Sequence, residues 1–346
     1  MADCIYCGAL GDSREHWLPR GFGSIKGLTP LQDRLCSRCN NALGHELDEA
    51  ILRTGPTGFV RWALKIEGRH GKTVNPFHYR VMGKESATTL TMRSPSGDYE
   101  ILAESYTDAD GRGHARLLRQ LVFKKNDGEL VPVPFPPAYD AARLRALVKE
   151  RGVEGAKLEF VYLGVGEGPD DFEDIRRVLT DAVGKFGANV YYGEGPSGGK
   201  KEVLLRAGIS LPYLRGLAKI GFHYYLAVCR THTGAELLFQ PIRQFIRHGE
   251  GDWHSFVSLT VPQFIGQLAE GQVPECWSHF FGCNKVNGEL VVAVQFFVGP
   301  DHLMPPSAVR LGVSSRPAKR HCHWVAYYGD KIDGYNGEIT EVLHQP

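Results

Sequence analysis

Two Cys-x-x-Cys pairs constrain the fold of this chain more than any other feature of its sequence. The pairs are Cys4/Cys7 and Cys36/Cys39, and both lie in the segment that ends at Asp48. Four thiolates in two tight pairs suit a tetrahedral zinc site with Zn–S distances of about 2.3 Å. Metal binding by such a site supplies free energy for folding the surrounding chain. We therefore predict a structural Zn²⁺ ion at these four cysteines.

The loop between the pairs carries an acid–histidine dipeptide, Glu15-His16, and Asn40 directly follows the fourth cysteine. Pro19 favours extended backbone just before it, so a short strand is expected near His16. Beyond Asn40, apolar residues recur at helical spacing: Ala42, Leu43, Leu47, Ile51 and Leu52. A strand bearing His16 that packs on a helix beginning at Asn40 would bring Glu15, His16 and Asn40 together. Such a cluster is a divalent-metal site with a general base beside it.

This stretch resembles the HNH endonucleases, specifically the ββα-metal nucleases whose core is held by two Cys-x-x-Cys pairs. The matching residues are Cys4, Cys7, Glu15-His16-x-x-Pro19 and Cys36-x-x-Cys39-Asn40-x-x-Leu43-Gly44. The resemblance implies an enzyme that hydrolyses phosphodiester bonds in DNA, with His16 as the general base that activates water. It also implies that Glu15 and Asn40 bind one catalytic Mg²⁺ or Mn²⁺, while the zinc ion is structural.

Other charged residues of the same region have more than one interpretation. His45 lies one turn beyond Asn40 and is either a further ligand of the catalytic ion, a phosphate contact or a solvated helix residue. Arg14, Arg20 and Arg38 are candidate DNA contacts, and the alternative for each is an ordinary surface charge. The sequence leaves these alternatives open.

The match with the HNH pattern has one departure. The asparagine usually found shortly before the third cysteine is missing, and Leu31 and Gln32 occupy that region. Gln32 could replace it in tying the loop together through backbone hydrogen bonds. The rival hypothesis is a zinc-knuckle protein that binds nucleic acid or senses a ligand and has no nuclease activity. A small nuclease module on a large unrelated domain also resembles restriction and phage-defence effectors.

The length of 346 residues suits two domains. We predict an α+β protein with an HNH module at 1–72 and a larger mixed α/β domain at 73–346, which recognises the substrate or regulates the enzyme. A further subdivision is expected near 132–138. The formal net charge of +1 gives no overall basic field for nucleic acid, so DNA binding would depend on a local basic surface.

Residues 73–346 show the mixed periodicity of an α+β domain, with antiparallel strands towards the C-terminal end. Helices are predicted at 115–123, 141–150, 170–183, 211–230 and 237–247. Strands are predicted at 77–82, 88–92, 99–102, 157–163, 189–192, 256–261, 277–282, 290–298, 308–313 and 324–328. Asn287-Gly288 predicts a tight hairpin turn. The proline-rich run Val131–Pro137 is interpreted as a stiff connector. Arg243, Arg247 and His248 form either a solvated basic strip or a DNA contact.

The four remaining cysteines are scattered without ligand spacing: Cys229, Cys276, Cys283 and Cys322. Free thiols beside a thiolate metal site indicate a reducing compartment. Apolar runs long enough for a membrane span are lacking, so we expect a cytoplasmic protein without a membrane partner. The expected partner is DNA. A homodimer, which would supply two active sites for two strands, and a small-molecule effector of the large domain are open alternatives.

Overall fold

The structure is a computed structural model that describes the following residues: 2–64, 66, 76, 88–93, 100–107, 113–135, 140–163, 176–182, 189–191, 203–259, 277–298, 304–316, 321–327 and 336–341. The strand predicted at 77–82 and the loops at 164–169 and 193–201 lie outside the described residues. The fold is mixed α/β with mainly antiparallel sheets, in agreement with the predicted α+β class. Among the described helices, none is long and apolar enough to cross a membrane.

Two compact units make up the chain. Unit 1 combines residues 1–76 with 208–346, and unit 2 comprises 77–207. The sequence predicts a module at 1–72 separate from 73–346. The observed division ends the first segment close to that boundary but joins it to residues 208–346, because the two segments share one apolar core.

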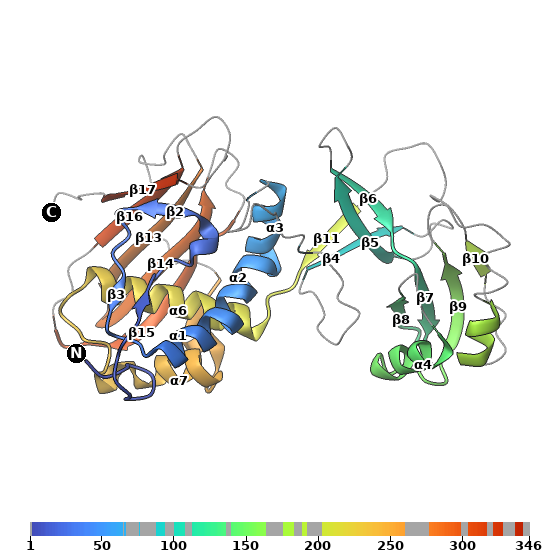
Figure 1. The fold of residues 1–346 in the computed structure, drawn as a ribbon, viewed down its shortest axis with the longest axis horizontal. Coiled ribbons are helices and arrows are strands. Elements are labelled where there is room, and N and C mark those ends of the chain that lie inside the picture. The colour runs from blue at the N-terminus through green and yellow to red at the C-terminus, as the bar shows by residue number, and fades with distance from the viewer. Residues whose placement is uncertain are drawn as a thin grey trace. The chain divides into compact units, whose positions relative to one another are not determined.

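The first segment of unit 1 contains a two-stranded sheet followed by a run of short helices (Figure 1). Its elements are β1 (Arg14–Glu15), η1 (Arg20–Phe22), β2 (Ser24–Lys26), β3 (Leu31–Gln32), α1 (Ser37–Leu43), the π-helical η2 (Gly44–Asp48), α2 (Glu49–Arg53) and α3 (Gly55–Ala63). Strands β1 and β3 are antiparallel, with Glu15 opposite Leu31. Between the two paired strands lie η1 and β2, of which β2 belongs to another sheet, and α1 follows β3.

The central helix of unit 1 is α6 (Leu211–Val228), which confirms the helix predicted at 211–230. Ser210 caps it by accepting a hydrogen bond from the Tyr213 amide at 3.3 Å. Nearly every side chain of α6 is buried, because the helix lies between the short helices of the first segment and the large sheet (Figure 1). Two glycines permit this: a Cβ at Gly216 would lie 2.6 Å from Ile51, and one at Gly221 would lie 2.8 Å from Val309.

A seven-stranded sheet covers one side of α6, in the order β12-β15-β14-β13-β16-β17-β2. Its later strands are β12 (Val257–Ser258), β13 (Ser278–Val286), β14 (Glu289–Val298), β15 (Ser307–Val313), β16 (His321–Tyr327) and β17 (Asn336–Glu341). Asn287 (φ 50°) and Gly288 (φ 87°) form the predicted hairpin turn, since such a turn needs left-handed backbone. At the sheet edge, β2 pairs in parallel with β17, so the two ends of unit 1 share one sheet.

Aromatic side chains of the first segment pack against aromatic residues of this sheet. The Trp17 ring lies 4.7 Å from the Phe281 ring and 5.0 Å from that of Tyr224 on α6. Phe22 stacks on Phe296 at 4.8 Å. Burying such rings contributes about 1.5–3 kcal/mol each. The segment that follows His16 is therefore anchored in the core.

The remaining helices of unit 1 follow α6. They are η3 (Leu237–Phe239), α7 (Gln240–His248) and η4 (Trp253–Ser255). Pro241 lies in the first turn of α7, where a missing N–H costs nothing, and Gly249 ends the helix in the left-handed conformation (φ 74°).

Unit 2 contains two four-stranded sheets, with the orders β10-β9-β7-β8 and β11-β4-β5-β6. The elements are β4 (Thr88–Arg93), β5 (Glu100–Thr107), β6 (Gly113–Leu117), β7 (Gln120–Lys124), β8 (Leu130–Pro134), α4 (Ala141–Glu150), β9 (Lys157–Tyr162), β10 (Asn189–Tyr191) and β11 (Val203–Ala207). Residues 176–182 are helical, within the predicted helix at 170–183. Strands β9 and β10 are parallel, as expected for strands joined by a helix.

Two predictions in unit 2 are wrong. The helix predicted at 115–123 is instead the end of β6 and nearly all of β7, because the run Leu121–Phe123 is buried within a sheet between β8 and β9. The connector predicted at Val131–Pro137 begins with most of β8. This strand lies at the sheet edge, where prolines such as Pro132 and Pro134 remove no interior hydrogen bonds.

Candidate functional site

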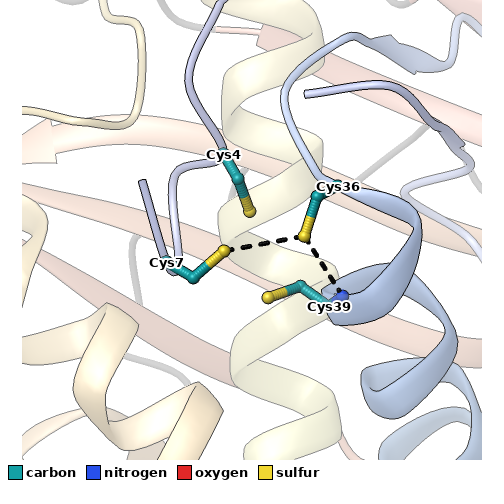
Figure 2. A group of neighbouring side chains, drawn as sticks. All are labelled: Cys4, Cys7, Cys36 and Cys39. Carbon is teal, nitrogen blue, oxygen red and sulfur yellow. Dashed lines mark hydrogen bonds between the residues drawn. The ribbon is translucent and has the colours of Figure 1, made fainter. Parts of the chain in front are cut away.

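The four paired cysteines converge on one point, and we call this group the cysteine knuckle (Figure 2). Its sulfur atoms all lie within 4.8 Å of one another, and those of Cys7 and Cys36 are 3.6 Å apart. A tetrahedron with Zn–S arms of about 2.3 Å places its sulfurs roughly 3.8 Å apart. Cys4, Cys36 and Cys39 are buried, while Cys7 is exposed. The knuckle can therefore hold a metal ion, and its geometry is compatible with zinc.

Helix α1 begins within the cysteine knuckle. Cys36 is its N-cap, and its sulfur accepts a hydrogen bond from the Cys39 amide at 3.4 Å. Asp12 adds a second cap, since its Oδ1 accepts from the amide and the hydroxyl of Ser37 at 2.6 and 2.9 Å. The helix thus begins at Ser37, earlier than the predicted start at Asn40, because the second pair of cysteines is part of the helix start.

Arginines of α7 hold the first cysteine pair in place. Arg243 donates to the carbonyl of Ile5 at 2.7 Å, and Arg247 donates to the carbonyl of Tyr6. Hydrogen bonds from a charged donor contribute about 1.5–3 kcal/mol each. These two arginines therefore form neither a purely solvated strip nor a free DNA contact. Their guanidinium groups tie the knuckle to the rest of unit 1.

Glu15 points inward from β1 and joins a buried ion cluster. Its Oε1 lies 2.6 Å from the Lys219 ammonium of α6 and 3.5 Å from His223 Nδ1. The contact with Lys219 is an ion pair and not an aligned hydrogen bond, since Oε1 accepts no hydrogen bond of ordinary geometry among the described residues. Burial alone would raise the pKa of Glu15, but Lys219 and then His223 outweigh it and lower this pKa to about 2. The carboxylate is therefore ionised.

Lys219 has a second carboxylate partner. Asp48, at the end of η2, accepts from the Lys219 ammonium through Oδ1 at 2.7 Å and Oδ2 at 2.9 Å. Lys219 is 0% exposed, and burial would lower its pKa, but Asp48 and Glu15 raise it. Burial raises the pKa of Asp48 itself. One ammonium thus pairs with two converging carboxylates.

These residues belong to a stripe along α6 that the sequence interpretation missed. Arg215, Lys219 and His223 follow one another at four-residue spacing and are all buried, and we call them the polar stripe. Arg215 forms an ion pair with Glu46 of η2, and His223 Nε2 lies 2.9 Å from the Tyr6 hydroxyl. The i, i+4, i+8 spacing of polar residues on an otherwise apolar helix was visible in the sequence, but their acidic partners lie some 170 residues or more away.

His16 takes a different direction from Glu15, being half-buried at the end of β1. Its Nε2 lies 3.2 Å from the Arg20 guanidinium, while its Nδ1 is buried without a hydrogen-bond partner among the described residues. Burial, followed by the positive charge of Arg20, lowers the pKa of His16, so the ring is neutral at pH 7. Arg14 and Arg20 are exposed and both carry positive charge close enough to lower this pKa.

The other predicted site residues lie apart from Glu15 and His16 in their contacts. Asn40 is half-buried on α1, and within the described part of the chain no hydrogen bond or ion pair joins it to Glu15 or His16. His45 and Arg38 are exposed. The structure thus places His16 beside Arg20 and Glu15 beside Lys219. It shows no contact that assembles Glu15, His16 and Asn40 as one cluster.

The Glu15 carboxylate already pairs with a cation of the protein itself. Among the described His, Cys, Asp and Glu side chains, the cysteine knuckle is the only group of three or more whose donor atoms can surround one ion. The Glu15 oxygen that would face an ion already has the Lys219 nitrogen 2.6 Å away. A second cation there would meet like charge in a buried site.

Comparisons with known proteins were made by sequence and by structure. The chain matches no family model, no curated protein and no solved structure.

Proposed function

We propose that this protein is an endonuclease of the HNH type that hydrolyses phosphodiester bonds in DNA. The observation that carries the proposal is the order of elements at the knuckle. The two cysteine pairs enclose an antiparallel strand pair, β1 and β3. Helix α1 begins within the second cysteine pair, and His16 directly follows β1. A structural Zn²⁺ at the four cysteines would fix this arrangement.

His16 has the properties of a general base. Its lowered pKa leaves the imidazole neutral, which is the form that can take a proton from water. Arg20 now donates to Nε2, because a guanidinium has no acceptor atom. A DNA phosphate that drew Arg20 away would free Nε2 to accept the proton of an attacking water. Arg14, exposed beside it, would serve as a second phosphate contact.

The remaining parts of the proposal come from the sequence resemblance. It assigns a catalytic Mg²⁺ or Mn²⁺ to Glu15 and Asn40, with His45 as a further candidate ligand, and Arg38 as a third DNA contact. Unit 2 would recognise the substrate or an effector, as in restriction and phage-defence enzymes. The ion would supply stabilisation of charge on the scissile phosphate.

Plasmid cleavage by the zinc-loaded protein tests this proposal. Wild type and His16→Ala are incubated with Mg²⁺, with Mn²⁺ and with EDTA, and His254→Ala serves as a matched variant of an exposed histidine outside the proposed site. We expect metal-dependent nicking or linearisation by wild type and a loss of about 10²–10⁴-fold in His16→Ala. Intact plasmid in every wild-type reaction would refute the nuclease.

One observation favours a second candidate function, a zinc-knuckle protein that binds nucleic acid or a ligand without cutting. The Glu15 carboxylate is occupied by Lys219 and does not face an open ion site. This candidate predicts DNA affinity that is indifferent to Mg²⁺, together with intact plasmid in all reactions. Electrophoretic mobility shifts with and without Mg²⁺ distinguish it from the nuclease.

A further inference from the structure

The polar stripe of α6 offers a role for Glu15 that differs from the one the resemblance implies. We infer that Glu15 is a positioning residue: Lys219 and His223 hold its carboxylate, and this contact sets the strand end that presents His16. The inference rests on the proposed function for its catalytic consequence. Its structural claim, that α6 fixes the strand through Glu15, can be tested without any activity.

The first reason is that the Lys219 ammonium already pairs with the Glu15 carboxylate. Lys219 Nζ lies 2.6 Å from Glu15 Oε1 and 2.7 Å from Asp48 Oδ1. Lys219 is fully buried and Glu15 is 7% exposed, so bulk water screens their attraction little. A protein-borne cation therefore neutralises the carboxylate, as a divalent ion would in the HNH assignment.

The second reason is the geometry of β1. This strand is only two residues long, Arg14 and Glu15, and pairs only with the equally short β3. His16 directly follows this strand, so the backbone that Glu15 ties to α6 is the backbone that presents His16. Its side chain is half-buried, whereas that of Glu15 is buried.

The third reason is that α6 is itself buried in this region. Lys219 and His223 lie in the middle of an 18-residue helix that is buried on nearly all sides. His223 is anchored from behind by the Tyr6 hydroxyl at 2.9 Å, and Tyr6 stands between the first two cysteines. The knuckle, the strand end and α6 thus form one connected polar contact, which suits a base that must be held within a fraction of an ångström.

The test compares zinc-loaded full-length variants. Glu15→Gln removes the charge but keeps the shape, Lys219→Gln removes the cation, and Lys219→Arg restores it. Glu129→Gln is the matched control, because its partner Lys125 forms an exposed ion pair of similar length, 2.7 Å. Amide hydrogen exchange of residues 13–17 and Mn²⁺ affinity, measured by the electron paramagnetic resonance of free Mn²⁺ with and without a DNA duplex, are the two readouts.

Positioning predicts faster exchange at residues 13–17, by about tenfold, in Glu15→Gln and Lys219→Gln, with recovery in Lys219→Arg and no change in Glu129→Gln. It also predicts that Glu15→Gln leaves Mn²⁺ affinity within about twofold of wild type. Should Lys219→Gln fail to fold, Glu15→Gln alone decides. Unchanged exchange in Glu15→Gln would overturn the inference, and so would a loss of Mn²⁺ affinity of tenfold or more, the least expected from losing a ligand.

Cleavage assays separate this inference from the proposed function. If wild type cuts DNA, positioning predicts that Glu15→Gln lowers kcat by about 10²-fold with little change in KM, since a displaced base impairs the chemical step and not binding. A change confined to KM would contradict it. If wild type leaves DNA intact, the nuclease proposal fails, while hydrogen exchange still decides whether Glu15 positions the strand end.

Discussion

The two units differ in what their interiors bury. In unit 1 the described buried polar residues include charged ones, Glu15, Arg215 and Lys219, which lie beside an extensive apolar core. In unit 2 the described buried polar residues are Thr91 and Gln120, both uncharged. Gln120 satisfies both ends of its amide on the backbone of Leu102, at 3.0 and 2.8 Å. The interior of unit 1 thus contains buried ion pairs, whereas that of unit 2 contains apolar packing and a neutral amide.

This difference follows from how each unit is assembled along the chain. Unit 2 is continuous, from 77 to 207, whereas unit 1 joins residues 1–76 to 208–346. Buried ion pairs add little net stability, because desolvation of the charges offsets their attraction, but they select one arrangement over others. In unit 1 the polar stripe matches Arg215 to Glu46 and Lys219 to Glu15 and Asp48. The stripe therefore specifies how the two segments meet.

Metal removal should give the largest effect and should affect the units unequally. With zinc in the cysteine knuckle, a strong chelator or Cys36→Ser is expected to destabilise unit 1 by several kcal/mol, up to the order of 10 kcal/mol. The knuckle anchors the first segment, and the Arg243 and Arg247 hydrogen bonds to it would be lost. Hydrogen exchange should rise throughout 208–248 and stay low in β7 and β9. Equal loss of protection in both units would show that they unfold together.

Replacing a buried charged side chain should lower the free energy of unfolding more than replacing a buried amide side chain. We expect Lys219→Met to lower the free energy of unfolding of unit 1 by about 3–5 kcal/mol, because it leaves two carboxylates buried without a cation. Gln120→Leu in unit 2 should cost about 1–3 kcal/mol, since it leaves only backbone groups of Leu102 and Leu118 unpaired. Urea unfolding followed by hydrogen exchange assigns each loss to its unit. If both variants lost a similar free energy of unfolding, buried charge would not distinguish the interior of unit 1 from that of unit 2.

Acid should weaken unit 1 through Glu15. Its pKa is about 2 in the folded protein against an ordinary value of 4.5, so the carboxylate stabilises the folded state above pH 4.5. That contribution, on the order of 1–3 kcal/mol, is lost as the pH falls from about 4.5 towards 2. Urea midpoints for residues of α6 should therefore fall more steeply with pH in wild type than in Glu15→Gln. Glu129→Gln, whose carboxylate is exposed, should follow the wild-type curve.

Local features of the fold were predictable from the sequence because their causes are local. Ser210 and Pro212 marked the start of α6, and Asn287-Gly288 marked the hairpin, since each residue type suits one backbone conformation. The edge strand β8 was missed because prolines are compatible with an edge, which only the sheet order reveals. The pairing of β2 with β17 has no local signature, as it joins strands from opposite ends of the chain.

The candidate site also has one part that was predictable from the sequence and one part that was not. The cysteine knuckle was predictable, because its spacing alone determines that four sulfurs can meet. The partners of Glu15 were not, since Lys219 and His223 lie on a helix about 200 residues away and their roles depend on tertiary packing. Apolar periodicity identified α6 as a core helix. Periodicity of its polar residues would have suggested that it also pairs with buried acids.

The smallest predicted effects concern how closely α6 approaches the first segment. Gly216→Ala should lower the free energy of unfolding of unit 1 by about 1–3 kcal/mol. The added Cβ would lie 2.6 Å from Ile51 Cγ1 and 3.0 Å from the Leu47 carbonyl, and backbone cannot yield as a flexible side chain does.

Gly44→Ala is the matched change on the facing segment. Gly44 has helical backbone (φ −62°), and its nearest neighbour would be Asp48 Oδ2 at 3.7 Å, so the higher helix propensity of alanine should stabilise by about 0.5–1 kcal/mol. Opposite shifts of the urea midpoint would show that the two segments meet in the close contact described. A neutral Gly216→Ala would mean that α6 and α2 can separate, and that the ion pairs of the polar stripe hold them without close packing.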